Sequence, residues 1–235
     1  MTRTCIQFAL GSLLLAAVPL SATANENAPS ETVDTNAPQA WQPEDGDVIS
    51  FKVLRKGKPF GTHTVSFDVD SDGSFTATSE VELKAGFGPI TLYRYELNTT
   101  ETWEDGVLVG LEGQTNDDGD DEAVSASLEE GKLAVAGTGF EGAVPVGIIP
   151  SSHWNIQEAF SSKIISTQDG EILDVDVTTI GEDTVTVAGE EVPATHYRLV
   201  SDLTVDLWYD EQSRWVKLSF EARGQKIDYV LNALY

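Results

Sequence analysis

The chain has 235 residues and is strongly acidic, with 39 Asp and Glu against 14 Lys and Arg and a formal net charge of −25. A surface of this charge makes nucleic acid and anionic membranes poor partners, because both repel it. The single cysteine, Cys5, lies at the N-terminal end, so the rest of the chain has no thiolate nucleophile, disulfide or cysteine metal ligand.

The first residues have the pattern of a secretory signal peptide. Arg3 supplies a positive charge, residues 6–20 are mostly apolar, and Ala22-Thr23-Ala24 offers small residues for cleavage. The apolar run is shorter than the roughly 20 residues that a membrane-spanning helix needs. We expect residues 1–24 to be removed near Ala24 and the protein to be exported to the periplasm or the medium, not embedded in a membrane.

Residues 25–40 are polar, contain proline and have almost no large apolar side chain. This composition is typical of a disordered linker. We therefore expect one domain over residues 41–235, beginning near Trp41.

Alternation of apolar and polar residues then predicts β-strands. His63, Val65 and Phe67 alternate with polar residues, as in a strand with one buried face. Hairpin turns are indicated by four short acidic-glycine pairs: Asp72-Gly73, Asp105-Gly106, Asp118-Gly119 and Glu130-Gly131.

The middle of the chain differs from the rest. Residues 137–150 are rich in glycine and apolar residues and predict a loop that could act as a lid. Ser151 or Ser152 is placed to cap one short helix, which would carry apolar side chains at Trp154, Ile156, Ala159 and Phe160. Strand patterns resume at residue 172 and continue to residue 233.

About a dozen strands joined by tight turns predict an all-β fold, an antiparallel meander that curls into a half-barrel or barrel with one short helix. An outer-membrane barrel is not favoured, because the hairpins are short on both sides and no aromatic girdle repeats.

Several strings resemble those of a domain-of-unknown-function family of exported Gram-negative bacterial proteins. They are Phe51-Lys52-Val53, Phe60-Gly61-Thr62-His63, Ser152-His153-Trp154-Asn155, Thr167-Gln168-Asp169-Gly170, Leu207-Trp208-Tyr209-Asp210, Arg214-Trp215-Val216 and Tyr229-Val230-Leu231. The resemblance covers most of residues 47–233 and implies a Gram-negative envelope protein without implying an activity. The layout is also similar, at the level of fold, to the half-barrels of periplasmic lipoprotein carriers.

One string resembles the first half of a calcium loop. Asp68, Asp70 and Asp72 precede Gly73 in the order D-x-D-x-D-G, and alternating carboxylates could supply several calcium ligands. Ser79 stands where the closing glutamate is expected, and the flanking segments are strands. Acidic residues on the solvent face of a strand that ends in a turn give the same letters.

No catalytic motif is present: the chain has no G-x-S-x-G elbow, no HExxH pair and no glycine-rich phosphate loop. We therefore expect no enzyme activity and no cofactor. The candidate ligand-binding residues are His63, whose alternation with Val65 and Phe67 predicts an inward imidazole, and the aromatic residues Trp154, Phe160 and Trp208.

Three functions remain open. The chain could bind a lipid or other apolar molecule in the concave face of a curved sheet, be a structural or interaction protein with a filled core that meets another envelope protein, or be a calcium-stabilised module.

Overall fold

The structure is a computed structural model that describes residues 37–87 and 90–235. The predicted signal peptide, and residues 25–36 of the predicted linker, lie outside the described residues. The end of that linker is part of the folded unit, since Gln157 Nε2 donates a hydrogen bond to the backbone oxygen of Pro38 and Ala40 packs against the core.

In the described part of the chain, thirteen strands form one antiparallel sheet in the order β12-β13-β14-β15-β16-β1-β2-β3-β4-β5-β6-β7-β8. The N-terminal strands are β1 (Val48–Arg55), β2 (Lys58–Val69), β3 (Phe75–Phe87), β4 (Ile90–Glu104), β5 (Val107–Asp117), β6 (Asp120–Glu129), β7 (Lys132–Gly137) and β8 (Glu141–Pro145). The C-terminal strands are β12 (Asp176–Val187), β13 (Glu190–Val200), β14 (Thr204–Asp210), β15 (Trp215–Ala222) and β16 (Gln225–Leu231).

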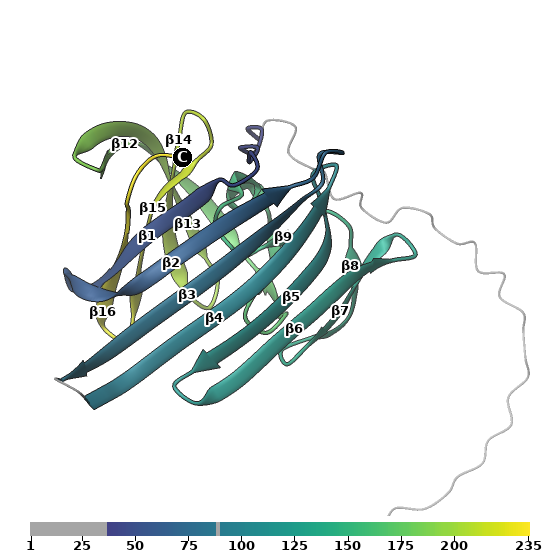
Figure 1. Ribbon diagram of the computed structural model, residues 1–235, viewed down its shortest axis with the longest axis horizontal. Coiled ribbons are helices and arrows are strands. Elements are labelled where there is room, and N and C mark those ends of the chain that lie inside the picture. Colours follow the sequence, from purple (N-terminus) through teal and green to yellow (C-terminus); the bar gives the residue numbers. More distant parts are fainter. Residues whose placement is uncertain (1–36, 88–89) are drawn as a thin grey trace, which may run out of the picture. The chain divides into compact units, whose positions relative to one another are not determined.

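The sheet is a meander, and its first strand, β1, lies in the middle of the strand order. Strands β1 to β8 follow one another outward in one direction, and β12 to β16 return so that the last strand pairs with the first, with Phe51 opposite Leu231. Strands β8 and β12 are the two edges, so the sheet curls without closing, and β13 to β15 lie behind β1 and β2 in Figure 1. The predicted all-β antiparallel meander is confirmed.

A covering segment, residues 149–175, links the two edges and lies against the concave face. It contains β9 (Ile149–Pro150), the 3₁₀ turn η1 (Ile156–Phe160), β10 (Lys163–Ile165) and β11 (Ile172–Asp174), and its three strands form a small sheet. Residues 137–150, expected to be a loop, are instead mostly the end of β7, the edge strand β8 and β9.

Glycines in the long sheet allow this segment to approach closely. A Cβ on Gly113 of β5 would lie 2.5 Å from Thr167 O, and a Cβ on Gly137 of β7 would lie 2.1 Å from Asp169 O. Both distances are far below contact, so only glycine permits the observed packing.

The predicted helix is a single 3₁₀ turn, and neither Ser151 nor Ser152 caps it. Asn155 is the N-cap, with its side chain accepting a hydrogen bond from Gln157 N at 3.0 Å. Asparagine caps as well as serine does, and the turn ends at Phe160 after five residues. No helix among the described residues is long and apolar enough to cross a membrane.

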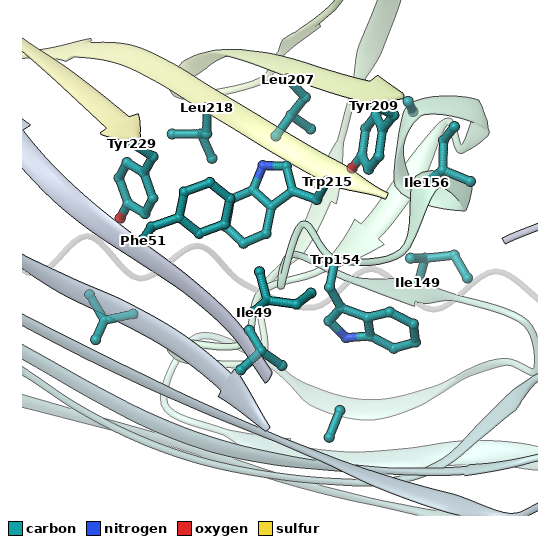
Figure 2. Close-up of a cluster of buried hydrophobic side chains, with 14 of the residues drawn as sticks. Ile49, Phe51, Ile149, Trp154, Ile156, Leu207, Tyr209, Trp215, Leu218 and Tyr229 are labelled. Carbon is teal, nitrogen blue, oxygen red and sulfur yellow. The ribbon is translucent and has the colours of Figure 1, made fainter. Parts of the chain in front are cut away.

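One end of the curled sheet is filled by aromatic packing. Trp154 of the covering segment meets Phe67, Phe75 and Trp103 edge to face, with ring centroids 5.3 to 5.7 Å apart. Figure 2 shows Trp215 and Phe51 of the long sheet in the same apolar cluster, with Ile149 and Ile156 of the covering segment. This core holds the covering segment in place and closes that end.

Candidate functional site

Beyond the aromatic core, a cavity of about 650 Å³ lies between the concave face and the covering segment. Its wall is mainly apolar, and includes Phe60, Val81, Leu83, Leu97, Ile164, Val175, Leu199, Val205, Leu218, Phe220, Ile227 and Tyr229. The exposed side chains of Leu92 and Arg223 also line the cavity, so the cavity reaches the surface beside these two residues. We call this its open end. An apolar, partly enclosed space of this size is typical of small-molecule sites.

The inner end of the cavity carries polar groups that lack protein partners. The side chains of His63, Ser79, Thr99 and Ser152 all line the cavity and are at most 5% exposed. Within the described residues, no group forms a hydrogen bond of normal geometry with either ring nitrogen of His63 or with the hydroxyl of Ser79, Thr99 or Ser152, although the Ser152 hydroxyl lies close enough to the Glu101 carboxyl to lower its pKa. We call these four residues the polar floor.

Strand register brings three of them together. Ser79 of β3 lies directly opposite Thr99 of β4, and His63 of β2 lies opposite Val81, one inward position along from Ser79. Residues two apart on a strand share a face, so the three side chains form a diagonal stripe on the concave surface. Ser152 belongs to the covering segment.

His63 is uncharged at neutral pH. Burial, and secondarily the positive charge that His153 can carry, lower the pKa of His63 from 6.5 to about 3. Its ring meets Trp215 at 5.3 Å and Tyr229 at 5.7 Å between centroids, both edge to face. A neutral imidazole offers one donor and one acceptor, and aromatic faces satisfy neither fully.

A buried carboxyl group lies between the polar floor and the aromatic core. Glu101 Oε2 accepts hydrogen bonds from Trp103 Nε1 at 2.9 Å and from Trp154 Nε1 at 3.1 Å. Burial raises the pKa of Glu101 from 4.5 to about 7, against the opposing effects of the nearby Ser152 hydroxyl and of the two indole N–H groups. Glu101 itself does not line the cavity.

The part-buried His153 and the buried Glu158 form a pair near the start of the covering segment. His153 Nδ1 lies 3.1 Å from both carboxylate oxygens of Glu158, and Tyr209 OH donates to the backbone oxygen of His153 at 2.7 Å. His153 has a left-handed backbone, with φ of 68°, which these contacts hold. Ser152 Oγ has no hydrogen bond to His63 or to His153.

At the open end the wall becomes charged and aromatic. The guanidinium of Arg55 lies over the Phe60 ring at 5.2 Å, and that of Arg223 lies over the Tyr93 ring at 5.9 Å. Arg223 is also 3.9 Å from Asp117. The cavity thus runs from an uncharged polar floor, past apolar walls, to a charged rim.

The sequence-predicted ligand residues are not brought together. His63 lines the cavity, while Trp154 lies in the aromatic core and Phe160 packs on Tyr197; neither of the last two is part of the cavity wall. Trp208 lies on the opposite face of the sheet, stacked on His196 at 4.1 Å with Lys217 over its ring.

The reason for the misplacement of Trp208 is local. Leu207, Trp208 and Tyr209 are consecutive and all buried, so apolarity alone does not tell which face of β14 is inward. Pairing settles it, because Leu207 lies opposite Leu218, whereas Trp208 lies opposite Lys217.

The aspartates of the calcium-like string are exposed at the end of β2 and in the turn that follows. Asp72 Oδ1 accepts hydrogen bonds from Ser74 N and Oγ, an ordinary turn arrangement that lowers the pKa of Asp72. Among residues 37–87 and 90–235, no group of three or more His, Cys, Asp or Glu could hold a metal ion, so Asp68, Asp70 and Asp72 do not form a cage.

Sequence reasoning missed Ser79, Thr99 and Ser152. A usable signal was present in β3 and β4, where Ser79 stands between Ala77 and Val81, and Thr99 follows Leu97, at positions that alternation makes inward. Polar residues at inward positions mark either a buried hydrogen bond or a ligand.

Comparison with known proteins agrees with this fold. A crystal structure of a beta-barrel-like protein of domain of unknown function DUF1849 from Brucella abortus matches with a TM-score of 0.56 and 10% identity, covering 79% of this chain and 95% of that one. A search of curated proteins found no match. The family model described as domain of unknown function DUF6134 matches residues 51–232.

Proposed function

Since the chain belongs to the DUF6134 family, whose description gives no activity, its role must be inferred from the cavity, and we propose that it binds an apolar small molecule, such as a lipid or acyl chain. The cavity carries this proposal: about 650 Å³ is enclosed by mainly apolar side chains and reaches the surface. A filled core would leave no such space.

The energy for binding would come from the walls. Each methylene moved from water into an apolar site contributes about 0.8 kcal/mol. Val81, Leu97, Leu218 and Ile227 lie on strands from both halves of the sheet and line the same cavity, so a chain placed there contacts apolar groups on several sides.

The proposed place of action is the bacterial envelope or the medium. The signal-peptide pattern of residues 1–24 supports export. Outside the cytoplasm, a soluble protein with an apolar cavity could carry or sequester a molecule that water does not dissolve. Binding, without chemical conversion of the ligand, is the activity we propose.

The first experiment is native mass spectrometry of protein purified without detergent. An added mass that is released on denaturation supports the proposal and identifies the ligand class. The same protein is then incubated with envelope lipids. A bare protein mass before and after incubation would contradict the proposal and favour a structural or interaction role.

Two tryptophan variants on β15 test whether the cavity is the site. Ala222 lines the cavity near its open end, so Ala222→Trp should obstruct it and weaken displacement of a fluorescent acyl probe. Glu221→Trp places the same side chain on the other face of the same strand and should leave probe binding unchanged. Equal binding by both variants would place the ligand elsewhere.

A further inference from the structure

The polar floor contains more hydrogen-bonding capacity than the protein uses. A buried polar group without a partner costs about 1–3 kcal/mol, and such groups are rare in native structures. Here four lie together at the inner end of one cavity: His63, Ser79, Thr99 and Ser152. Their clustering points to a common partner.

Taken with the proposed function, on which this inference rests, the geometry points to a long-chain ligand with an uncharged hydroxyl-bearing head, such as a fatty alcohol or a monoacylglycerol. We propose that the head lies on the polar floor, between His63, Ser79 and Thr99, and that the tail runs along the apolar walls toward Arg55 and Arg223.

The chemistry of the floor selects an uncharged head. The unpartnered groups of the floor are three hydroxyls and one imidazole, which donate and accept hydrogen bonds but carry no charge near neutral pH. Glu101 Oε1 also lacks a partner among the described residues, but Glu101 does not line the cavity. The carboxylate of Glu158 also lines the cavity, and it is already paired with His153. A carboxylate or phosphate head would be buried here without a counter-ion, which is costly.

The orientation follows from the two ends of the cavity. The inner end is polar and closed by the aromatic core, while the walls between are apolar, including Leu83, Phe60 and Ile227. The rim groups are partly satisfied by one another, since Arg223 lies near Asp117 and over Tyr93. In the described part of the chain, Asp117 Oδ1 is one unpartnered oxygen at the rim, and the other four unpartnered groups that line the cavity are at the inner end, where the head would form the most hydrogen bonds.

The test uses a matched pair of double variants across β3 and β4. Ser79→Ala with Thr99→Val removes two hydroxyls of the floor at nearly constant shape. Thr78→Val with Thr100→Val makes a similar change at the neighbouring cross-strand pair, which alternation places on the opposite face of the sheet. Each protein is titrated by probe displacement with dodecanol, dodecanoate and dodecane.

We expect the floor variant to bind dodecanol about tenfold more weakly, the value of roughly one hydrogen bond, while dodecane affinity is unchanged. The control variant should bind dodecanol, dodecanoate and dodecane with the same affinities as the unaltered protein. Near-ultraviolet circular dichroism verifies folding, and Ser79→Ala alone, which should show a smaller loss for dodecanol only, replaces the double variant if that does not fold.

Two results would overturn the inference while leaving the proposed function intact: dodecanol affinity that does not depend on Ser79 and Thr99, with dodecane still bound, or tighter binding of dodecanoate than of dodecanol. Failure of all three compounds to displace the probe from the unaltered protein would overturn both.

Discussion

Trp154 and Glu101 join the covering segment to the long sheet by one fully buried hydrogen bond, from the indole Nε1 to the carboxylate Oε2 at 3.1 Å. Trp103 donates to the same oxygen. The covering segment, which forms one side of the cavity, is thus attached at a group whose ionisation state changes near neutral pH.

Replacement of Glu101 by Gln should change how stability depends on pH. Burial raises the pKa of Glu101 from 4.5 to about 7, so the folded state holds a proton that the unfolded chain releases above 4.5. Stability from this group is present at low pH and is lost as pH rises toward 7, by about 3 kcal/mol for a shift of this size. Urea unfolding should show that the free energy of unfolding of the Glu101→Gln variant increases relative to that of the unaltered protein as pH rises from about 4.5 to 7. A difference that stays constant with pH would contradict the assignment.

His63 should produce the opposite slope. Its pKa is lowered to about 3, so the unfolded chain takes up a proton below 6.5 while the folded state resists it. Stability is complete above 6.5 and is lost as pH falls, by about 3 kcal/mol between pH about 6.5 and 4. The His63→Phe variant lacks this loss, so its free energy of unfolding should increase relative to that of the unaltered protein as pH falls. His196→Phe is the control, because His196 lies on the other face of the sheet, bonded to Asp206 at 2.9 Å. An equal acid response of both variants would argue against a neutral His63.

The docking of the covering segment depends on glycines. Gly113→Ala puts a methyl group 2.5 Å from Thr167 O and should destabilise the fold by about 1–3 kcal/mol and weaken probe binding, because the segment must move away. Gly110→Ala on the same strand meets nothing closer than 3.4 Å and should change both far less. Urea unfolding and probe titration measure the two effects. Similar losses in the two variants would mean that the effect comes from the strand and not from the docking.

Chain length should control affinity. For a series of saturated alcohols, each added methylene should tighten binding about fourfold, as long as the added group is buried. Once the chain fills the cavity and reaches Arg55 and Arg223, further methylenes should add little. Probe displacement across the series measures this. An affinity independent of chain length would show that the apolar walls do not contact the ligand.

Much of the fold could be predicted from short-range patterns. The pairs Asp105-Gly106, Asp118-Gly119 and Glu130-Gly131 predicted turns, and all six residues have positive φ. Alternation through Val65 and Phe67 placed His63 inward, where it is found. These features depend only on residues close in sequence.

The cavity could not be predicted in the same way, because it depends on which segment lies over which strand. Nothing local indicates that residues 149–175 cross the concave face or that Thr167 meets Gly113. Ser79 and Thr99 are common residues in strands, and their importance comes from the cavity they line, whose wall also includes residues distant in sequence such as Ser152. Trp208 shows the reverse case, an aromatic residue that looks like a ligand contact and is used on the outer face.

The pairing of β1 with β16 has a consequence for how the chain acquires its structure. Phe51 and Val53 lie near the start of the domain, and their partners Leu231 and Tyr229 follow them by about 180 residues in the sequence. Contacts so distant in sequence form late and slowly, because a long loop must close before they yield any energy. A polypeptide in which β16 has not yet formed therefore keeps an unpaired edge at β1.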